Sequence, residues 1–100
     1  MSVLMTLRVT GDPKKLEEFA ADGESPLRMI RDRAVGHGCL SHHFYGTDDE
    51  IMVVDEWRDE ASYRAFFDGS PEIKEVMDAA GVTTQPAIQV WRKLETGDDV

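Results

Sequence analysis

Hydrophobic residues along the chain follow two different periods, and the way these periods alternate predicts an α+β fold. Four segments have the aliphatic and aromatic content of β-strands and are bounded by turn residues: residues 3–9, 39–45, 51–57 and 87–94. In the two longer connections, after the first and the third of these strands, apolar residues recur at helical spacing. Residues 46–50 form a short polar turn that predicts a hairpin. The expected order is therefore β-α-β-β-α-β.

The first long connection is predicted to hold two short helices. Asp12 is a suitable N-cap, and Pro13 after it is favoured at the first helical position. Gly23 and Pro26 then interrupt the apolar stripe. A second helical segment is expected to start near Pro26 and to end at Gly36.

The second long connection repeats this arrangement. Asp59 caps a helix, residues 68–71 interrupt it, and Gly81 ends the restarted segment. Four residues recur 45 positions later: Ser25, Pro26, Ala34 and Gly36 correspond to Ser70, Pro71, Ala79 and Gly81. The repeat fits either two copies of a β-α-β unit or the start and stop residues that helices share. Two split β-α-β units give the ferredoxin-like sandwich with a four-stranded antiparallel sheet, because right-handed crossovers leave few other topologies.

The two strands expected at the centre of this sheet are also the most aliphatic. Residues 3–5 and 51–54 are apolar at consecutive positions, whereas the side chains of a strand alternate between the two faces of the sheet. Both faces are therefore expected to be apolar and covered. Helices can cover only one of them, so a second copy of the chain is expected on the other, as a homodimer.

Composition and charge fit a globular domain and exclude several partners. The 100 residues suit a single domain, with residues 3–94 as its core and 95–100 as a polar tail. A formal net charge of −9 without a basic stripe argues against nucleic acid. No apolar run approaches the roughly 20 residues that span a bilayer. The N-terminus lacks signal-peptide features and Cys39 is the only cysteine, so a cytoplasmic protein without a membrane role is expected.

Several short motifs are spread over the chain: Gly38-Cys39 at the start of the second strand, Val54-Asp55-Glu56-Trp57 at the end of the third, Asp59-Glu60-Ala61 with Tyr63 and Phe66-Phe67 in the next helix, and Ser70-Pro71. Together with the order and lengths of the elements, they resemble the antibiotic biosynthesis monooxygenase-like (ABM) family of dimeric α/β barrels over nearly the whole chain. The resemblance implies two sheets packed face to face in a barrel, with a pocket between each sheet and its own helices.

Members of this family differ in chemistry. They include oxygenases that attack quinol-like or polyketide-derived aromatics without metal or flavin, enzymes that bind and degrade haem, and proteins without established catalysis. The haem-degrading members use a histidine in the helical segment after the third strand and an asparagine near the first strand. Here Met77 lies near the matching helical position, that helix has no histidine, and the chain has no asparagine. The resemblance therefore disfavours haem and favours a protein without a cofactor.

The cofactor-free oxygenases are the better match. A tryptophan at the end of their third strand, with a tyrosine six residues later, resembles Trp57 and Tyr63. In those enzymes an asparagine and an arginine help to hold the substrate. This chain has no asparagine, and no arginine lies in the second half of the helical segment after the third strand. Substrate would have to be positioned by other residues.

Oxygenation without a cofactor requires a base, a hydrogen-bond donor and a dry apolar pocket. His43 and Glu56 are the candidate bases, and Tyr63 is the candidate donor. The candidate substrate-binding walls are aromatic: Phe19, Trp57, Phe66 and Phe67. Each of these aromatic side chains fits a place in the hydrophobic core as well.

Strand alternation restricts which of the neighbouring histidines can act. His42 and His43 point to opposite faces of their strand, so only one of them can reach a pocket, and a purely structural or exposed role remains open for each. The same alternation puts Cys39 and His43 on one face, but about 13 Å apart. That separation is too large for one metal ion, and no metal site is expected.

The neighbouring carboxylates pose the same question. Asp55 and Glu56 face opposite ways, and one of them is expected to be partly buried. Burial would raise its pKa and make it a plausible acid or base. The alternative is an ion pair with an arginine on a neighbouring strand, Arg8 or Arg92.

Two hypotheses remain. The first is a homodimeric monooxygenase-like protein that binds or oxygenates a small aromatic or quinone-like compound without metal or flavin. The second is a small-molecule-binding or purely structural homodimer with the same fold and no catalysis. Likeness of fold alone is weak support for an activity.

Overall fold

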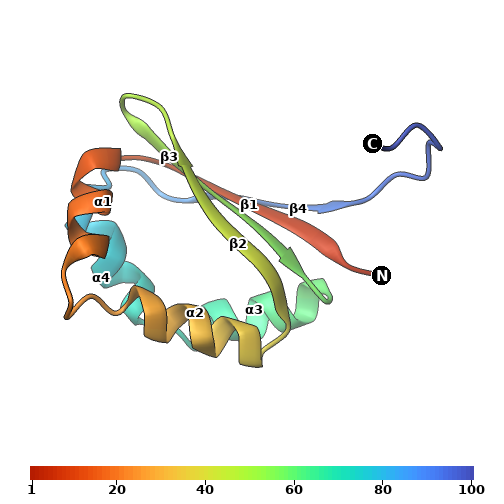
Figure 1. The fold of residues 1–100 in the computed structure, drawn as a ribbon, viewed down its shortest axis with the longest axis horizontal. Coiled ribbons are helices and arrows are strands. Elements are labelled where there is room, and N and C mark those ends of the chain that lie inside the picture. Colours follow the sequence, from red (N-terminus) through yellow and green to blue (C-terminus); the bar gives the residue numbers. More distant parts are fainter.

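The elements follow one another in the predicted order. The computed structural model describes residues 1–100 and contains β1 (Val3–Thr10), α1 (Pro13–Ala21), α2 (Leu27–Gly36), β2 (Cys39–Gly46), β3 (Glu50–Trp57), α3 (Glu60–Asp68), α4 (Glu72–Ala79) and β4 (Ala87–Arg92) (Figure 1). Both long connections hold two helices, as predicted. The last strand ends at Arg92, two residues earlier than expected.

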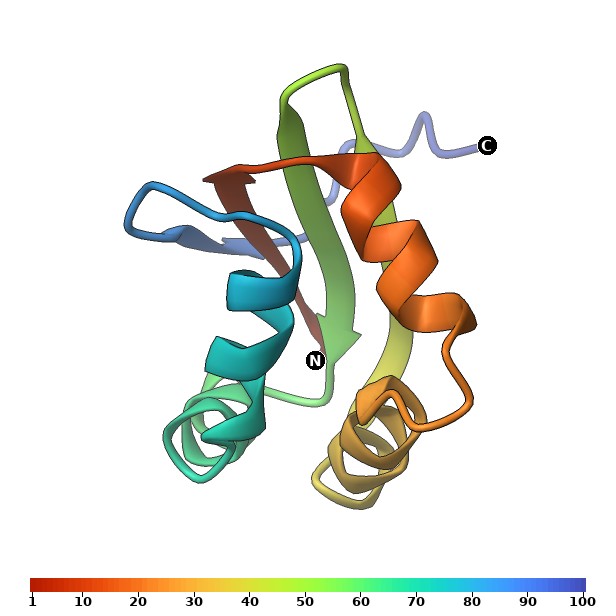
Figure 2. The ribbon, with the colours of Figure 1, turned by 90° about the vertical axis from the view of Figure 1, so that its left-hand side faces the viewer.

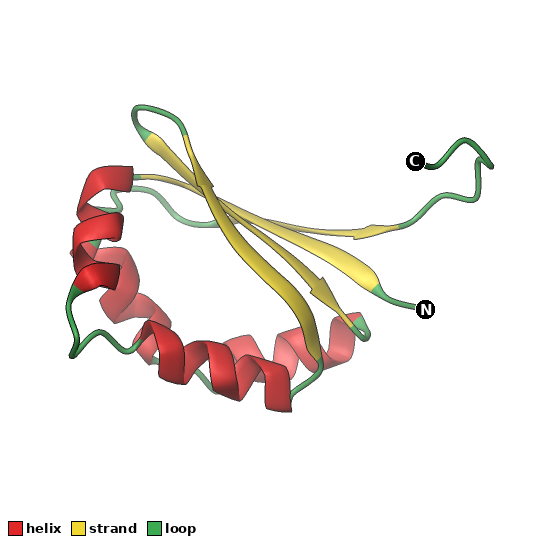
Figure 3. Ribbon diagram, in the orientation of Figure 1, coloured by secondary structure: helices red, strands yellow, loops and turns green.

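The four strands form one antiparallel sheet in the order β2-β3-β1-β4. The central strands are therefore β1 and β3, as the aliphatic content predicted. All four helices lie on one face of this sheet and the opposite face carries no helix (Figure 3). The helices form two groups, α1 with α2 on the side of β2 and α3 with α4 on the side of β4 (Figure 2). This is the predicted ferredoxin-like α+β architecture.

Local signals explain where the helices begin. The Asp12 side chain accepts a hydrogen bond from the Lys14 amide at 2.9 Å, and the Asp59 side chain accepts one from the Ser62 amide at 2.7 Å. Both satisfy a backbone donor that the helix itself leaves free. These contacts lower the pKa of Asp59, chiefly through the Ser62 amide. At the start of β2, Gly38 has a φ of 107°, a conformation that other residues rarely adopt.

The hydrophobic core lies between the sheet and its helices. The inward residues of β1 are Met5, Leu7 and Val9, each at most 5% exposed, and the helices contribute Leu16, Ala34, Tyr63, Phe66, Val76 and Ala80. Trp57 at the end of β3 is fully buried. Its ring contacts Tyr63 edge-on and Phe66 at a tilt, with centroids 5.6 and 5.2 Å away. This aromatic cluster joins β3 to α3.

The uncovered face of the sheet, called the open face below, is only partly apolar. Its exposed large hydrophobic side chains are Leu4, Tyr45 and Trp91, which are 42%, 56% and 51% exposed, and the partly buried Met52 and Val54 of β3 lie on the same face. Polar residues alternate with them in the register, among them Thr6, whose hydroxyl accepts a hydrogen bond from the Trp91 indole at 3.0 Å. The prediction of two apolar faces is therefore correct for the helix side and too strong for the open face.

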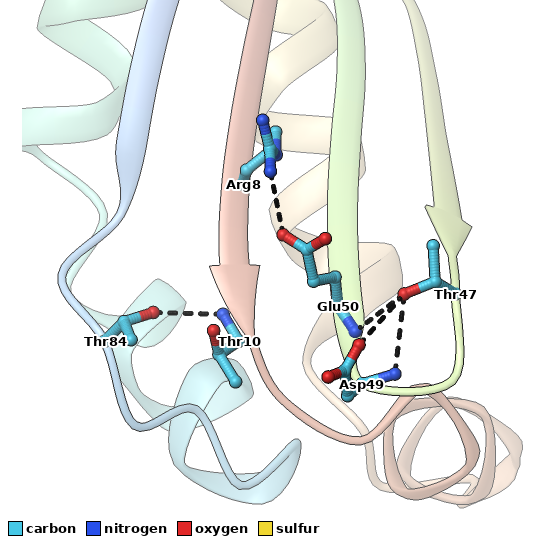
Figure 4. A network of polar contacts seen from close by, with 6 residues as sticks. All are labelled: Arg8, Thr10, Thr47, Asp49, Glu50 and Thr84. Atoms are coloured by element: carbon cyan, nitrogen blue, oxygen red, sulfur yellow. Dashed lines mark hydrogen bonds and ion pairs between the residues drawn. The ribbon is translucent and has the colours of Figure 1, made fainter.

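One end of the sheet is closed by a polar network (Figure 4). Arg8 forms an ion pair with Glu50 at 2.9 Å, which links the two central strands. The Thr47 hydroxyl accepts a hydrogen bond from the Glu50 amide and so shapes the β2–β3 turn. The Thr10 amide donates to the Thr84 hydroxyl at 3.0 Å, just before β4. Arg8 is thus occupied by Glu50 and does not pair with Asp55 or Glu56, contrary to the predicted alternative.

The helices are too short and too polar for a bilayer, since none of them combines the length and apolar character that a membrane-spanning helix needs.

Candidate functional site

An apolar cavity of about 110 Å³, partly open to solvent, lies between the sheet and the helices. Strands β1, β2 and β3 provide one side and α2, α3 and α4 most of the other. Its lining is hydrophobic except for three side chains, which are Arg31, His42 and Asp55. A cavity of this kind holds few polar groups, and the ones present can orient a ligand.

A β-bulge decides which side chains of β2 face this cavity. Cys39 pairs with Trp57, and Ser41 pairs with the next residue of β3, Glu56, so Leu40 is left without a partner and is 61% exposed. The extra residue reverses the alternation beyond it. His42 therefore lies on the helix side, opposite Asp55. The prediction that Cys39 shares a face with His43 is wrong for this reason.

The Asp55 carboxylate is buried and holds two partners. Oδ1 lies 2.7 Å from Nδ1 of His42, and Oδ2 accepts a hydrogen bond from the Trp57 indole N–H at 3.2 Å. Asp55 is only 5% exposed, and a buried carboxylate is unfavourable without such donors. Its position on the same side of β3 as Trp57 brings it under the helices. The expected ion pair with Arg8 or Arg92 is replaced by these two contacts.

The contact with Asp55 fixes the role of each nitrogen of His42. An ionised carboxylate can only accept, so with Asp55 ionised Nδ1 carries the proton of this hydrogen bond. In neutral His42 the lone pair then resides on Nε2, which is free to take a proton from a bound molecule. Buried carboxylates orient catalytic histidines in the same way in hydrolases. The His42 ring also packs edge-on against Phe44, with centroids 4.9 Å apart.

Tyr63 supplies an unused polar group beside the same cavity. It is 2% exposed and its ring lines the cavity, yet its hydroxyl has no hydrogen-bond partner in the protein. Burial raises the pKa of Tyr63 to about 12, so the phenol stays protonated at neutral pH. A buried hydroxyl without a partner is unusual and requires an explanation. A ligand oxygen or a water molecule would satisfy it.

The predicted site residues are only partly brought together. Tyr63, Phe66 and Phe67 line the cavity. Trp57 and Phe19 belong to the surrounding core and do not line it. His43 and Glu56 lie on the open face, where Glu56 accepts a hydrogen bond from the Ser2 hydroxyl at 2.6 Å.

His42 and Asp55 take the places for which His43 and Glu56 were considered. For the carboxylates a signal existed, because Asp55 is two residues from Trp57 and must share its face. A buried Trp57 therefore implied an inward Asp55. For the histidines, the sequence alone did not reveal the bulge at Leu40.

Neither a reactive thiol nor a metal-binding cluster accompanies these residues. Cys39 is buried, and burial, with a smaller contribution from the Asp55 charge, raises the pKa of its thiol to about 11. The thiol is therefore protonated at neutral pH and is a poor nucleophile. Histidine, cysteine and carboxylate side chains do not gather in a group of three or more that could hold a metal ion.

Comparisons with known proteins identify the fold. No family model and no curated protein matches the sequence. The structure, however, superimposes on a cofactor-independent oxygenase, SnoaB from Streptomyces nogalater, with a TM-score of 0.60, 16% identity and 98% of both chains covered. The chain has the ABM fold. A monooxygenase from the ActVA-Orf6 gene of Streptomyces coelicolor, solved with nanaomycin D, gives a TM-score of 0.66 at 16% identity, covering 95% of this chain and 89% of that one.

A further ABM-fold structure, assigned to the antibiotic biosynthesis monooxygenases of Bordetella bronchiseptica, gives a TM-score of 0.67 at 14% identity, with 94% of this chain and 98% of that one covered. These matches cover nearly the whole chain. Because the sequences are so dissimilar, the ABM likeness establishes the fold and leaves the chemistry to the residues of this chain.

Proposed function

We propose that this protein binds a small aromatic, quinol-like compound in the cavity under its helices and oxygenates it without metal or flavin. The observation that carries the proposal is the His42–Asp55 pair in the lining of a mostly apolar cavity, together with the unpartnered hydroxyl of Tyr63, which lines the same cavity. The ABM fold, shared with a cofactor-independent oxygenase, agrees with this chemistry.

The proposed reaction begins with proton transfer. Nε2 of His42 takes a proton from a phenol or from its keto tautomer, and Asp55 stabilises the positive charge that develops on the ring. Trp57 acts indirectly, as a positioning residue that holds the second oxygen of Asp55. The Tyr63 hydroxyl donates to the oxygen of the substrate on which negative charge accumulates. The product of this step is an electron-rich enolate or phenolate.

Molecular oxygen is the co-substrate of the proposed second step. An enolate of the anthrone type supplies electrons to O₂, and a carbon–oxygen bond forms at the deprotonated carbon. One oxygen atom stays as the new carbonyl and the other leaves as water. The CH₂ group loses four electrons and O₂ gains the same four, so the reaction balances without a further reductant. The apolar lining keeps water from protonating the enolate.

The test is oxygen uptake by the metal-free protein over a panel of hydroquinones and anthrones. His42→Ala is expected to lower kcat/KM by about a hundredfold, the usual contribution of a positioned general base. Tyr63→Phe is expected to lower it by about tenfold or more, through loss of the donor to the developing charge.

The neighbouring histidine provides a matched control. His43→Ala removes the same side chain from the next residue of β2, on the open face, and is expected to retain most of the activity. Equal losses in the two histidine variants would contradict the assignment of His42. Uptake no faster than the spontaneous oxidation of every compound would contradict the oxygenase proposal.

Binding without turnover is the second candidate, because the small cavity limits how far a compound of several rings can enter and therefore whether its reacting carbon reaches His42. An engineered cavity of about 150 Å³ takes up benzene, whereas this one measures about 110 Å³. A bicyclic ligand therefore has to protrude through the opening or move the helices apart. Saturable binding of the same compounds, without oxygen uptake, would identify this function.

We also propose that the open face is covered by a second copy of the chain. Three large side chains from three strands lie exposed there: Leu4, Tyr45 and Trp91. Such an exposed apolar surface on a small protein commonly marks an interface. A symmetric dimer would bring each of these side chains against a matching surface.

A further inference from the structure

Arg31 is the single positively charged side chain among the residues that line the cavity. It lies in α2, on the helix face that Leu27, Ile30, Arg31 and Ala34 share through their spacing of three and four residues. The other members of this face are apolar. The Arg31 guanidinium therefore interrupts a hydrophobic stripe along this face of α2.

The present contact of Arg31 leaves donors available. Nε and Nη2 both donate to a single oxygen of the neighbouring Asp32, at 3.1 and 3.0 Å. Nη1 makes no hydrogen bond within the chain. The two side chains are 56% and 70% exposed, and ion pairs this exposed contribute little. A second carboxylate could therefore approach the guanidinium without breaking a strong contact.

The negative net charge of the protein makes a positive side chain at the cavity important for binding anions. The chain carries a formal net charge of −9, so its general field repels anions. The cavity also contains the Asp55 carboxylate, which is already engaged by His42. An anionic ligand would enter such a site only if a local cation compensated for its charge.

We infer that Arg31 selects aromatic ligands that carry a carboxylate, which binds the guanidinium at the cavity opening while the ring lies among the apolar residues. The planar guanidinium suits a carboxylate because it can offer two parallel N–H donors. This inference rests on the proposed function, since it concerns the same cavity, and it narrows the substrate class from aromatics in general to aromatic acids.

The test compares two probes of nearly the same shape, 2-naphthoate and the uncharged 2-naphthamide, by NMR titration of the protein at neutral pH. Neither probe has to be oxidised, so binding is measured apart from turnover. The wild-type protein is expected to bind the carboxylate about three- to tenfold more tightly than the amide. Arg31→Gln is expected to abolish this preference, through weaker binding of the carboxylate.

Arg28→Gln is the matched control, because Arg28 lies in the same helix but does not line the cavity. It is expected to retain the preference of the wild-type protein. If the wild-type protein binds both probes equally, or if Arg31→Gln keeps the preference, the role of Arg31 is overturned while the proposed function stands. If neither probe binds at millimolar concentration, the proposal of an aromatic-binding cavity fails, and the role of Arg31 fails with it.

Discussion

At the scale of single residues, the Tyr63 hydroxyl shows a conflict between stability and function. A buried polar group without a partner costs about 1–3 kcal/mol, and the Tyr63 hydroxyl is such a group in the ligand-free protein. The aromatic ring of Tyr63 packs against Trp57 and Phe67. The hydroxyl thus adds nothing to the stability of the fold, which agrees with the proposal that it donates a hydrogen bond to a bound molecule.

The conflict leads to a prediction for Tyr63→Phe. We expect the ligand-free variant to be more stable than the wild-type protein by about 1 kcal/mol, because it loses the unsatisfied hydroxyl and keeps the ring. Chemical denaturation at neutral pH measures this difference. Tyr45→Phe removes a hydroxyl from a tyrosine that is 56% exposed and is expected to change the stability by less than about 0.5 kcal/mol. A less stable Tyr63→Phe protein would show that the hydroxyl has a partner inside the fold.

The residues of the site illustrate what the sequence could and could not predict. Tyr63, Phe66 and Phe67 were found because helical spacing and family resemblance both pointed to α3. Asp55 could have been inferred from its spacing of two residues to Trp57, but Glu56 was taken as the candidate base. His42 did not follow from the sequence alone, because counting along the strand from the buried Cys39 selects His43. The bulge between them depends on tertiary packing that local pattern does not encode.

At the scale of elements, an ion pair joins α2 of the first long connection to α4 of the second. Arg33 of α2 contacts Glu72 at the start of α4 with two hydrogen bonds, both 2.9 Å long. The side chains are 30% and 27% exposed, so solvent screens this pair less than the other ion pairs between charged side chains. The same guanidinium reaches the Ser70 hydroxyl at 3.4 Å. Contacts of this kind between distant elements were not visible in the sequence.

This ion pair predicts a specific response to acid. The hydrogen bonds from Arg33 lower the pKa of Glu72 from 4.5 to about 2. A carboxylate with a lowered pKa in the folded state stabilises the protein above its unfolded pKa, and the contribution disappears as the pH falls from about 4.5 to about 2. Glu72→Gln is therefore expected to be less stable at neutral pH and to lose less stability across that range.

The measurement is a series of denaturation curves between pH 7 and pH 2. Glu75→Gln serves as the control, since Glu75 lies in the same helix and forms no ion pair. It is expected to follow the wild-type pH dependence. Parallel curves for the wild-type and Glu72→Gln proteins would show that the Arg33–Glu72 pair does not control the acid response.

The order of the elements was predictable because each boundary has its own local signal. Asp12 and Asp59 cap α1 and α3, and Pro26 and Pro71 precede α2 and α4, so both long connections were read correctly. The end of β4 was not predicted correctly. The strand was expected to include residues 93 and 94, but these residues lie beyond Arg92, the last residue of β4 that pairs with β1. Whether a strand continues depends on a neighbouring strand to pair with, and β1 begins at Val3, opposite Arg92.

At the scale of the whole molecule, one face of the sheet is covered by its own helices and the other is bare (Figure 3). An interface of ordinary size buries about 800 Å² on each partner. The open face offers Leu4, Tyr45 and Trp91 at its apolar positions, with Arg8 and Glu50 paired at one end. Mixed composition of this type is common at protein interfaces.

The predicted dimer can be measured by light scattering at about 10 μM protein. We expect a mass near twice the 11.2 kDa of one chain. Leu4→Glu places a charge on the open face, on the central strand β1 between Glu56 and Trp91, and is expected to shift the equilibrium toward monomer. Leu94→Glu changes another exposed leucine, beyond the sheet, and is expected to leave the mass unchanged. A wild-type mass of one chain would contradict the dimer.

The bulge at Leu40 separates β2 into two parts that can vary independently. The first part, at Cys39, is fixed by its junction with α2 and by Trp57, and the second part, from Ser41 onward, is fixed by the turn to β3. One unpaired residue absorbs any mismatch between them. We therefore expect an insertion or deletion next to Leu40 to change the connection between α2 and β2 without moving His42. A regular edge strand, in which every residue is paired, would shift its register instead.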